Sequence, residues 1–175
     1  MHLNVEIMAH CNRPNKIEQL LLNKNARYIG LDHQIDTYFK VANGRLKLRE
    51  GNIENNLIHY HRSNQAGPKQ SVVTLYKSQP DSSLKIILEK ANGVLVVVDK
   101  KRKIFFIQNV KFHIDEVNNL GSFVEIEAID EYGDIGIEKL NEQCQFYLQY
   151  LSIEAKDLVA ISYSDLLLDK FKEKS

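Results

Sequence analysis

Arg45-Leu46-Lys47-Leu48-Arg49 is the stretch that decides the fold, because basic and apolar side chains alternate along it without a break. Successive side chains of a β-strand point to opposite faces of the sheet. Arg45, Lys47 and Arg49 therefore share one face, and the two leucines share the other. The alternation predicts a strand with one packed apolar face and one face that carries a row of positive charge.

Two other segments show the same alternation with acidic side chains. Phe123-Val124-Glu125-Ile126-Glu127-Ala128 sets Glu125 and Glu127 on one face, and Val5-Glu6-Ile7 places Glu6 in the same way. A lone charged row is usually a solvated sheet face. A basic row and acidic rows within one small domain instead favour a site that holds a polyanion together with a divalent metal.

Turn residues and apolar periodicity divide the rest of the chain into short strands and a few helices. Asn43-Gly44, Gly51-Asn52 and Ala66-Gly67-Pro68 are typical of antiparallel hairpins. Helices are expected at 14–26, 81–91, from about 136 onward and at 162–171. Strands are expected at 3–11, 34–41, 45–50, 56–62, 71–77, 94–101, 104–109, 111–117 and 122–129. This pattern predicts a strongly curved sheet or closed barrel, with helices outside and the charged faces lining a wet interior that holds a ligand.

Composition narrows the class of protein. The chain has 175 residues, 43% of them hydrophobic, which is enough for one well-packed domain. Its 23 basic and 23 acidic side chains give zero net charge, which argues against a general nucleic-acid or membrane-surface binder. Cys11 and Cys144 are expected to be reduced packing residues. With no signal-peptide pattern and no apolar run long enough to span a bilayer, a cytoplasmic location is expected.

Several motifs occur in an order that resembles a known family. They are residues 4–9, 36–39, 44–51, 57–62, 67–69, 100–102, 113–115 and 120–127. Together they resemble the CYTH superfamily, the class IV adenylate cyclase and thiamine triphosphatase group of triphosphate tunnel metalloenzymes, and most closely its cyclase-like branch. The resemblance implies an α+β fold, a closed eight-stranded antiparallel β tunnel with helices packed outside. It also implies a single domain over residues 1–175, with the tunnel at about 3–130 and a helical cover at about 134–172.

The resemblance also implies roles for individual residues. Phosphate would be bound by Lys47, Arg49, Arg62, Lys100 and Arg102. Magnesium or manganese would be held by Glu6, Glu125 and Glu127. Tyr38 and Asp115 would be catalytic: Tyr38 would hydrogen-bond across the site, and Asp115 would ligate the metal or orient a basic residue. Arg45 ranks lower because it lies at the entrance of its strand, and His113 is expected to be structural.

One position departs from the family pattern. The first strand of the family reads Glu-x-Glu-x-Lys, whereas this chain has Asn4, Glu6 and Met8 there. A thioether carries neither the charge nor the proton chemistry of a lysine amine. His10 lies two residues further along the same face and is a partial substitute only at a displacement of about 7 Å. The hypothesis is a protein that binds triphosphates but turns them over weakly, or acts on a different substrate.

The sequence leaves three candidate functions open. The first is a metal-dependent enzyme on a small-molecule triphosphate, either a cyclase or a phosphohydrolase for thiamine triphosphate, tripolyphosphate or a nucleoside triphosphate. The second is a tunnel that binds phosphorylated ligands without efficient turnover. The third is a barrel for an apolar ligand, which requires Leu46 and Leu48 to face inward. Neither nucleic acid nor membrane is expected as a partner, and a homodimer remains open.

Overall fold

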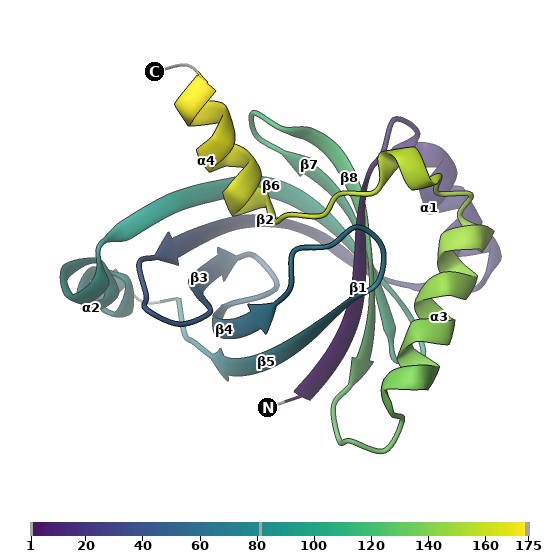
Figure 1. Ribbon diagram of the computed structural model, residues 1–175, viewed down its shortest axis with the longest axis horizontal. Coiled ribbons are helices and arrows are strands. Elements are labelled where there is room, and N and C mark those ends of the chain that lie inside the picture. Colours follow the sequence, from purple (N-terminus) through teal and green to yellow (C-terminus); the bar gives the residue numbers. More distant parts are fainter. Residues whose placement is uncertain (1, 81, 174–175) are drawn as a thin grey trace.

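The computed structural model describes residues 2–80 and 82–173, in which eight antiparallel strands close into a barrel. Residues 1, 81, 174 and 175, which the predicted domain includes, lie outside the described residues. Around the barrel the strands follow the order β1-β5-β4-β3-β2-β6-β7-β8 (Figure 1). The strands are β1 (His2–His10), β2 (Arg27–Phe39), β3 (Arg45–Gly51), β4 (Asn56–Arg62), β5 (Lys69–Lys77), β6 (Val94–Ile107), β7 (Val110–Val117) and β8 (Gly121–Asp130). The helices are α1 (Pro14–Asn23), α2 (Ser82–Asn92), α3 (Ile137–Tyr150) and α4 (Tyr163–Glu173), with a short 3-10 turn at Ala155–Asp157.

The closed eight-stranded barrel confirms the predicted fold, with two corrections to its elements. The two strands expected at 94–101 and 104–109 are one continuous strand, β6. Its charged run looks like a turn in the sequence, but Lys100 and Arg102 are buried whereas Lys101 is exposed, as strand alternation requires. The second correction is that β2 begins at Arg27 rather than at 34, and α1 ends at Asn23 rather than at 26.

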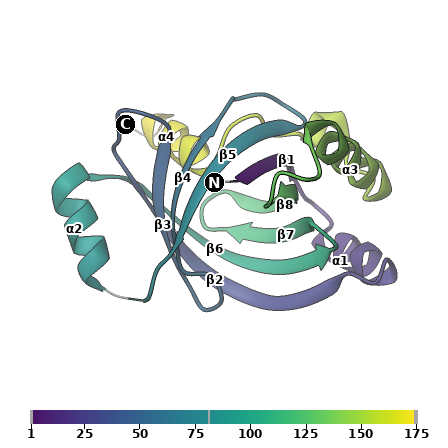
Figure 2. The ribbon, with the colours of Figure 1, turned by 90° about the horizontal axis from the view of Figure 1, so that it is seen from below.

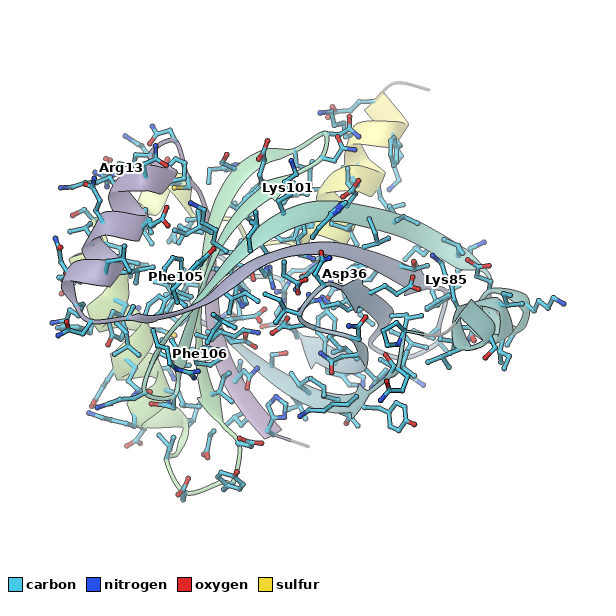
Figure 3. All side chains as sticks on the ribbon, turned by 180° about the vertical axis from the view of Figure 1, so that it is seen from behind. Arg13, Asp36, Lys85, Lys101, Phe105 and Phe106 are labelled. Carbon is cyan, nitrogen blue, oxygen red and sulfur yellow. The ribbon has the colours of Figure 1, made fainter. Side chains whose placement is uncertain are left out.

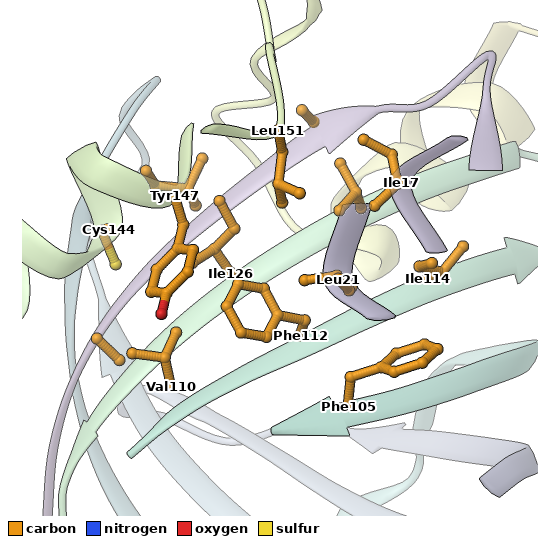
Figure 4. Close-up of a cluster of buried hydrophobic side chains, with 14 of the residues drawn as sticks. Ile17, Leu21, Phe105, Val110, Phe112, Ile114, Ile126, Cys144, Tyr147 and Leu151 are labelled. Atoms are coloured by element: carbon orange, nitrogen blue, oxygen red, sulfur yellow. The ribbon is translucent and has the colours of Figure 1, made fainter. Parts of the chain in front are cut away.

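The helices lie on the outside of the barrel. Figure 2 shows α1 and α3 together on one side and α2 on the opposite side. Helix α1 begins at Pro14. Proline lacks an amide proton, but the amide at this position would have no partner within the helix. Ile17 and Leu21 on this helix are buried against the sheet. On α3, Cys144 and Tyr147 pack into the same apolar cluster (Figure 4). Burial of each large apolar side chain stabilises the fold by about 1.5–3 kcal/mol. This cluster packs α1 and α3 against β1, β7 and β8.

The charge-striped strands orient as predicted. Lys47 and Arg49 of β3 line the interior, and Leu46 and Leu48, which alternate with them, lie on the other face. The apolar-ligand barrel, which needed Leu46 and Leu48 inside, is therefore wrong.

Both cysteines are free and buried. No helix among residues 2–80 and 82–173 is long and apolar enough to cross a membrane.

A segment at residues 158–164, here called the strap, covers one end of the barrel. Leu158 forms a β-bridge with Ala9, and the Val159 amide donates to the Met8 carbonyl at 2.8 Å. Met8 and Tyr163 are buried in one apolar cluster at this end. The polar interior therefore has an apolar floor beneath the strap.

Candidate active site inside the barrel

A cavity of about 630 Å³ runs into the barrel and is lined by side chains from all eight strands. This follows from the two-residue period of a strand, which sends every second side chain of a closed sheet inward. Most of the inward side chains in the middle of the barrel are charged. Burying so many charges is costly unless each one is paired, so their pairing describes the site.

Asp36 on β2 holds three of the predicted phosphate-binding cations. Its carboxylate accepts from Lys47 at 3.0 Å, from Arg49 at 2.8 and 2.9 Å, and from Lys100 at 2.7 Å. Burial raises the pKa of this carboxyl, but Arg49, Lys100 and Lys47 outweigh burial and hold the pKa well below its usual value. Figure 3 shows Asp36 amid the side chains that fill the barrel. One buried carboxylate thus holds three basic side chains together, and all three line the cavity.

Arg102 is oriented by carboxylates on the two following strands. It donates to Asp115 at 2.7 and 2.5 Å and to Glu125 at 2.9 Å. Asp115 also accepts from the Tyr163 hydroxyl at 2.8 Å, which ties this pair to α4. Of the two roles expected for Asp115, this geometry matches the partner that orients a basic residue.

Arg62 on β4 pairs with Glu6 on β1. Its Nε and Nη2 atoms are buried, and neither has a hydrogen-bond partner among the described residues. Buried donors without a partner are rare in folded proteins, and a guanidinium fork matches the oxygens of a phosphate. Arg62 therefore has two buried donors that could bind the oxygens of an anion.

The three predicted metal-binding carboxylates lie on neighbouring strands. Glu6 is directly opposite Glu127 in the β1–β8 register, and Glu125 is opposite Met8. Burial raises the pKa of Glu127, and the charges of Glu6 and Glu125 raise it further against the effect of Lys111. Hard oxygen donors that repel one another in this way fit a divalent cation.

Each carboxylate nevertheless has another partner. Glu6 pairs with Arg62, Glu125 with Arg102, and Glu127 accepts from the Asn4 amide at 2.5 Å. Within residues 2–80 and 82–173, no three His, Cys, Asp or Glu side chains are grouped closely enough to hold a metal. The donor chemistry fits Mg²⁺ or Mn²⁺, but ligation requires Glu6 and Glu125 to leave their arginines.

Tyr38, predicted to hydrogen-bond across the site, is buried and hydrogen-bonds to Tyr60. Burial and the charge of Asp36 raise the pKa of Tyr38 to about 12, so its hydroxyl stays protonated at neutral pH.

Arg45 donates to Asp165 on α4 at 2.9 Å, in keeping with its lower rank. His10 is exposed beside Phe123 and is not among the cavity-lining residues, so its role as a partial lysine substitute is wrong.

Several residues of the interior were not predicted as part of the site: Asp36, Glu54, Lys69, Lys111 and His113. His113 lines the cavity and bonds to Glu125 through Nδ1 at 2.8 Å, and burial lowers its pKa to about 4. Lys69 is fully buried and donates to the Val159 carbonyl at 2.7 Å, and burial lowers its pKa to about 8. Polar side chains alternate along β2 at Asp32, Gln34 and Asp36, and this pattern in the sequence could have indicated that they face the interior. Glu54 lies in a loop, where no such pattern marks it.

A model of the CYTH domain matches residues 3–163 of this sequence. The chain belongs to the CYTH family. No curated protein matches it.

Several solved structures have the same fold as this chain. The PH1012 protein from Pyrococcus horikoshii OT3 has 20% identity and a TM-score of 0.78, over 95% of this chain and 99% of that one. An adenylate cyclase candidate from Vibrio parahaemolyticus has 16% identity and a TM-score of 0.74, over 94% and 97%. HpAC1 from Hippeastrum, described by a dominant triphosphatase activity, has 12% identity and a TM-score of 0.64, over 98% and 96%. At these identities the likeness establishes the fold.

Proposed function

We propose that this CYTH protein is a divalent-metal-dependent enzyme that binds a small-molecule triphosphate in the barrel and cleaves a phosphoanhydride bond. The observation that carries the proposal is the set of basic side chains directed into one cavity, with Arg62 donors left unpaired. Phosphate oxygens are the ligands that such guanidinium and ammonium groups match best. The HpAC1 relative, with its triphosphatase activity, supports the same reaction type.

The balance of charge favours a metal–triphosphate complex over a free triphosphate. Seven basic side chains in and around the cavity face seven acidic ones, so the interior is close to neutral. The basic set is Lys47, Arg49, Arg62, Lys69, Lys100, Arg102 and Lys111, and the acidic set is Glu6, Asp32, Asp36, Glu54, Asp115, Glu125 and Glu127. A free triphosphate would add several negative charges to this interior, whereas a bound divalent cation would offset part of them.

Binding would proceed as an exchange of partners. Arg62 would leave Glu6, and Arg102 would leave Glu125, to hold phosphate oxygens in bidentate pairs. The released carboxylates, with Glu127, would hold Mg²⁺ or Mn²⁺, which supplies charge neutralisation at the phosphate oxygens during phosphoryl transfer. Asp115 would keep Arg102 in position, and Asp36 would do the same for Arg49 and Lys100. Tyr38, protonated at neutral pH, would act as a hydrogen-bond donor rather than as a base.

A second candidate is a domain that binds phosphorylated ligands with little turnover. Met8 favours it, because this residue lines the cavity yet packs beneath the strap with only 4% of its surface exposed. The neighbouring buried amine, Lys69, donates to the strap rather than lining the cavity. The first strand thus brings no amine to the reacting region, in contrast to the family pattern.

The test measures phosphate and pyrophosphate release from tripolyphosphate, thiamine triphosphate and ATP with Mg²⁺ or Mn²⁺. Glu125→Gln removes a metal-binding carboxylate, and Glu116→Gln, on the exposed face of the preceding strand, is the matched control. Metal-dependent release that Glu125→Gln abolishes and Glu116→Gln retains supports the enzyme, and pyrophosphate with cyclic AMP identifies a cyclase. Thermal stabilisation by tripolyphosphate without release supports the second candidate. Absence of both release and stabilisation contradicts both candidates.

A further inference from the structure

Two histidines lie side by side on the outer face of the barrel. They belong to the run His59-Tyr60-His61 of β4, in which Tyr60 faces the cavity. Strand alternation therefore directs both imidazoles outward, away from the proposed triphosphate site. His59 is half-buried and His61 is exposed. The pair is open to solvent and takes no part in the chemistry proposed above.

The two rings lie at the separation that a shared metal ion requires. Their centres are 5.0 Å apart and their planes meet at 78°. With a metal–nitrogen bond of about 2.1 Å and the ring centre about 1.1 Å behind the nitrogen, each ring centre lies about 3.2 Å from the metal. Two such rings at a nitrogen–metal–nitrogen angle of about 90–110° have centres about 4.5–5.2 Å apart. The observed separation falls within this range, so the backbone of β4 need not move to bring the rings onto one ion.

A backbone carbonyl orients the first ring. The Nε2 atom of His59 lies 3.0 Å from the carbonyl oxygen of Asn43. Because a carbonyl can only accept a hydrogen bond, Nε2 carries the proton and Nδ1 carries the free lone pair. Histidines that bind metals commonly donate their second nitrogen to a carbonyl or carboxylate in this way, which fixes the tautomer and the ring orientation. His59 is thus already in the form that binds a metal through Nδ1.

Gly44, in the turn before β3, makes room for both rings. Its φ of +67° lies in the left-handed region that glycine adopts without strain. A Cβ here would lie 2.9 Å from Nε2 of His59 and 3.0 Å from Cε1 of His61. Cε1 is bonded to both ring nitrogens, so the nitrogen-bearing edge of His61 approaches the same point as Nε2 of His59. The polar edges of the two rings therefore converge over this glycine.

Another outward-facing histidine shows a different arrangement. His33 on β2 is paired with the Asp99 carboxylate at 2.8 Å. Neither His59 nor His61 has such a carboxylate partner among the described residues. No acidic side chain thus competes with a metal ion for these two rings.

We propose that His59 and His61 form a two-imidazole site for a divalent transition-metal ion on the outer face of β4. Imidazole nitrogen suits Cu²⁺, Ni²⁺ and Zn²⁺, whereas Mg²⁺ prefers oxygen ligands. The part of the chain that the structure describes holds no group of three potential metal-binding side chains, so water completes the coordination on the exposed side of His61. Affinity follows the general order for such ligands, with Cu²⁺ bound more tightly than Ni²⁺ or Zn²⁺.

Calorimetry with the chlorides of Cu²⁺, Ni²⁺ and Zn²⁺ tests the site, with excess Mg²⁺ present to compete for the oxygen ligands of the cavity. His59→Asn and His61→Asn should each weaken binding about tenfold or more, because each removes one of the two protein ligands. His33→Asn, on the outer face of β2, is the matched control and should bind as the parent does. At one equivalent of Cu²⁺, the electron paramagnetic resonance spectrum of either variant should show coupling to one nitrogen fewer than the parent.

Thermal melting gives a second readout. An ion that binds the folded pair stabilises the protein, so saturating Ni²⁺ should raise the melting temperature of the parent and of His33→Asn more than that of the other two variants. Melting without metal checks that all variants fold. Equal affinities in the parent, His59→Asn and His61→Asn would overturn the proposal, and so would a loss in only one of the two variants. Either result would leave the proposed function standing, because the pair lies on the opposite face of the sheet from the cavity.

Discussion

Arg102 and Asp115 form a two-point ion pair inside the barrel, with Nε to Oδ1 at 2.7 Å and Nη2 to Oδ2 at 2.5 Å. Both side chains are buried, with 3% and 1% of their surfaces exposed. The pair spans β6 and β7, and Tyr163 links it to α4. One contact thus joins a proposed phosphate-binding arginine to the closed end of the cavity.

Asp115→Asn should therefore destabilise the protein as well as weaken its ligand binding. Breaking a buried ion pair by removing one partner costs about 3–5 kcal/mol. Arg102 keeps Glu125 as an anionic partner in this variant, so the loss is expected at the lower end of that range or below it. Urea unfolding measures this loss. Glu116→Gln, the exposed neighbour, should change the free energy of unfolding by about 0.5 kcal/mol or less. Equal stabilities of the two variants would contradict the importance of the pair.

Lys100 should make triphosphate binding pH-dependent. Burial, with Arg49, Arg102 and Lys47, lowers the pKa of Lys100 to about 7, although Asp36 raises it. Above that pH the free protein carries a largely neutral amine, and bound phosphate favours the charged form. Binding should therefore take up a proton at about pH 8, and affinity should fall as the pH rises above about 7.

Calorimetry in two buffers with different ionisation enthalpies measures this proton uptake. Lys100→Met should remove it, whereas Lys101→Met, on the exposed face, should retain it. Ionisation of the triphosphate itself contributes equally to both variants, so the difference between them isolates Lys100. Identical uptake in both variants would show that Lys100 does not titrate on binding.

The sequence predicts the barrel and much of its interior because strand alternation is strictly local. The neighbouring residues alone assign four charged side chains to one face of their strands: Lys47, Arg49, Glu125 and Glu127. In the closed sheet that face points inward. Asp36 shows where this reasoning stops. Its charge is evident from the sequence, but its three cationic partners come from β3 and β6. Only the strand order of the folded sheet puts those two strands on either side of β2.

Glu54 and Met8 show a second limit. Glu54 enters the cavity because Asp32, 22 positions earlier, binds the backbone of its loop, and no periodicity marks such a contact. From the sequence, Met8 is visible only as the residue that replaces the family's lysine. Its packing depends on the strap, which is about 150 residues away in the chain. Tertiary contacts of this kind are absent from any local pattern.

Gly51→Ala should disturb the loop that carries Glu54. A Cβ at this position would lie 2.7 and 2.8 Å from the two Asp32 carboxylate oxygens and 2.8 Å from the Glu54 carbonyl. Because Asp32 is fully buried and anchors the loop, relief of this clash should cost about 1–3 kcal/mol of stability. Urea unfolding measures the loss, and a variant as stable as the parent would show that the loop adapts without strain.

Met8→Lys tests whether the missing amine limits turnover. Met8 lines the cavity, so a lysine here could extend its amine toward the bound triphosphate from beneath the strap. The rate of metal-dependent phosphate release should rise by roughly tenfold or more, as expected for a restored proton-transfer group. Stability should fall, because a cation replaces an apolar side chain in the cluster with Phe123 and Tyr163. Met8→Leu, which keeps the apolar packing, should change neither property greatly. If the folded Met8→Lys protein hydrolyses every triphosphate at the parent rate, Met8 does not limit turnover.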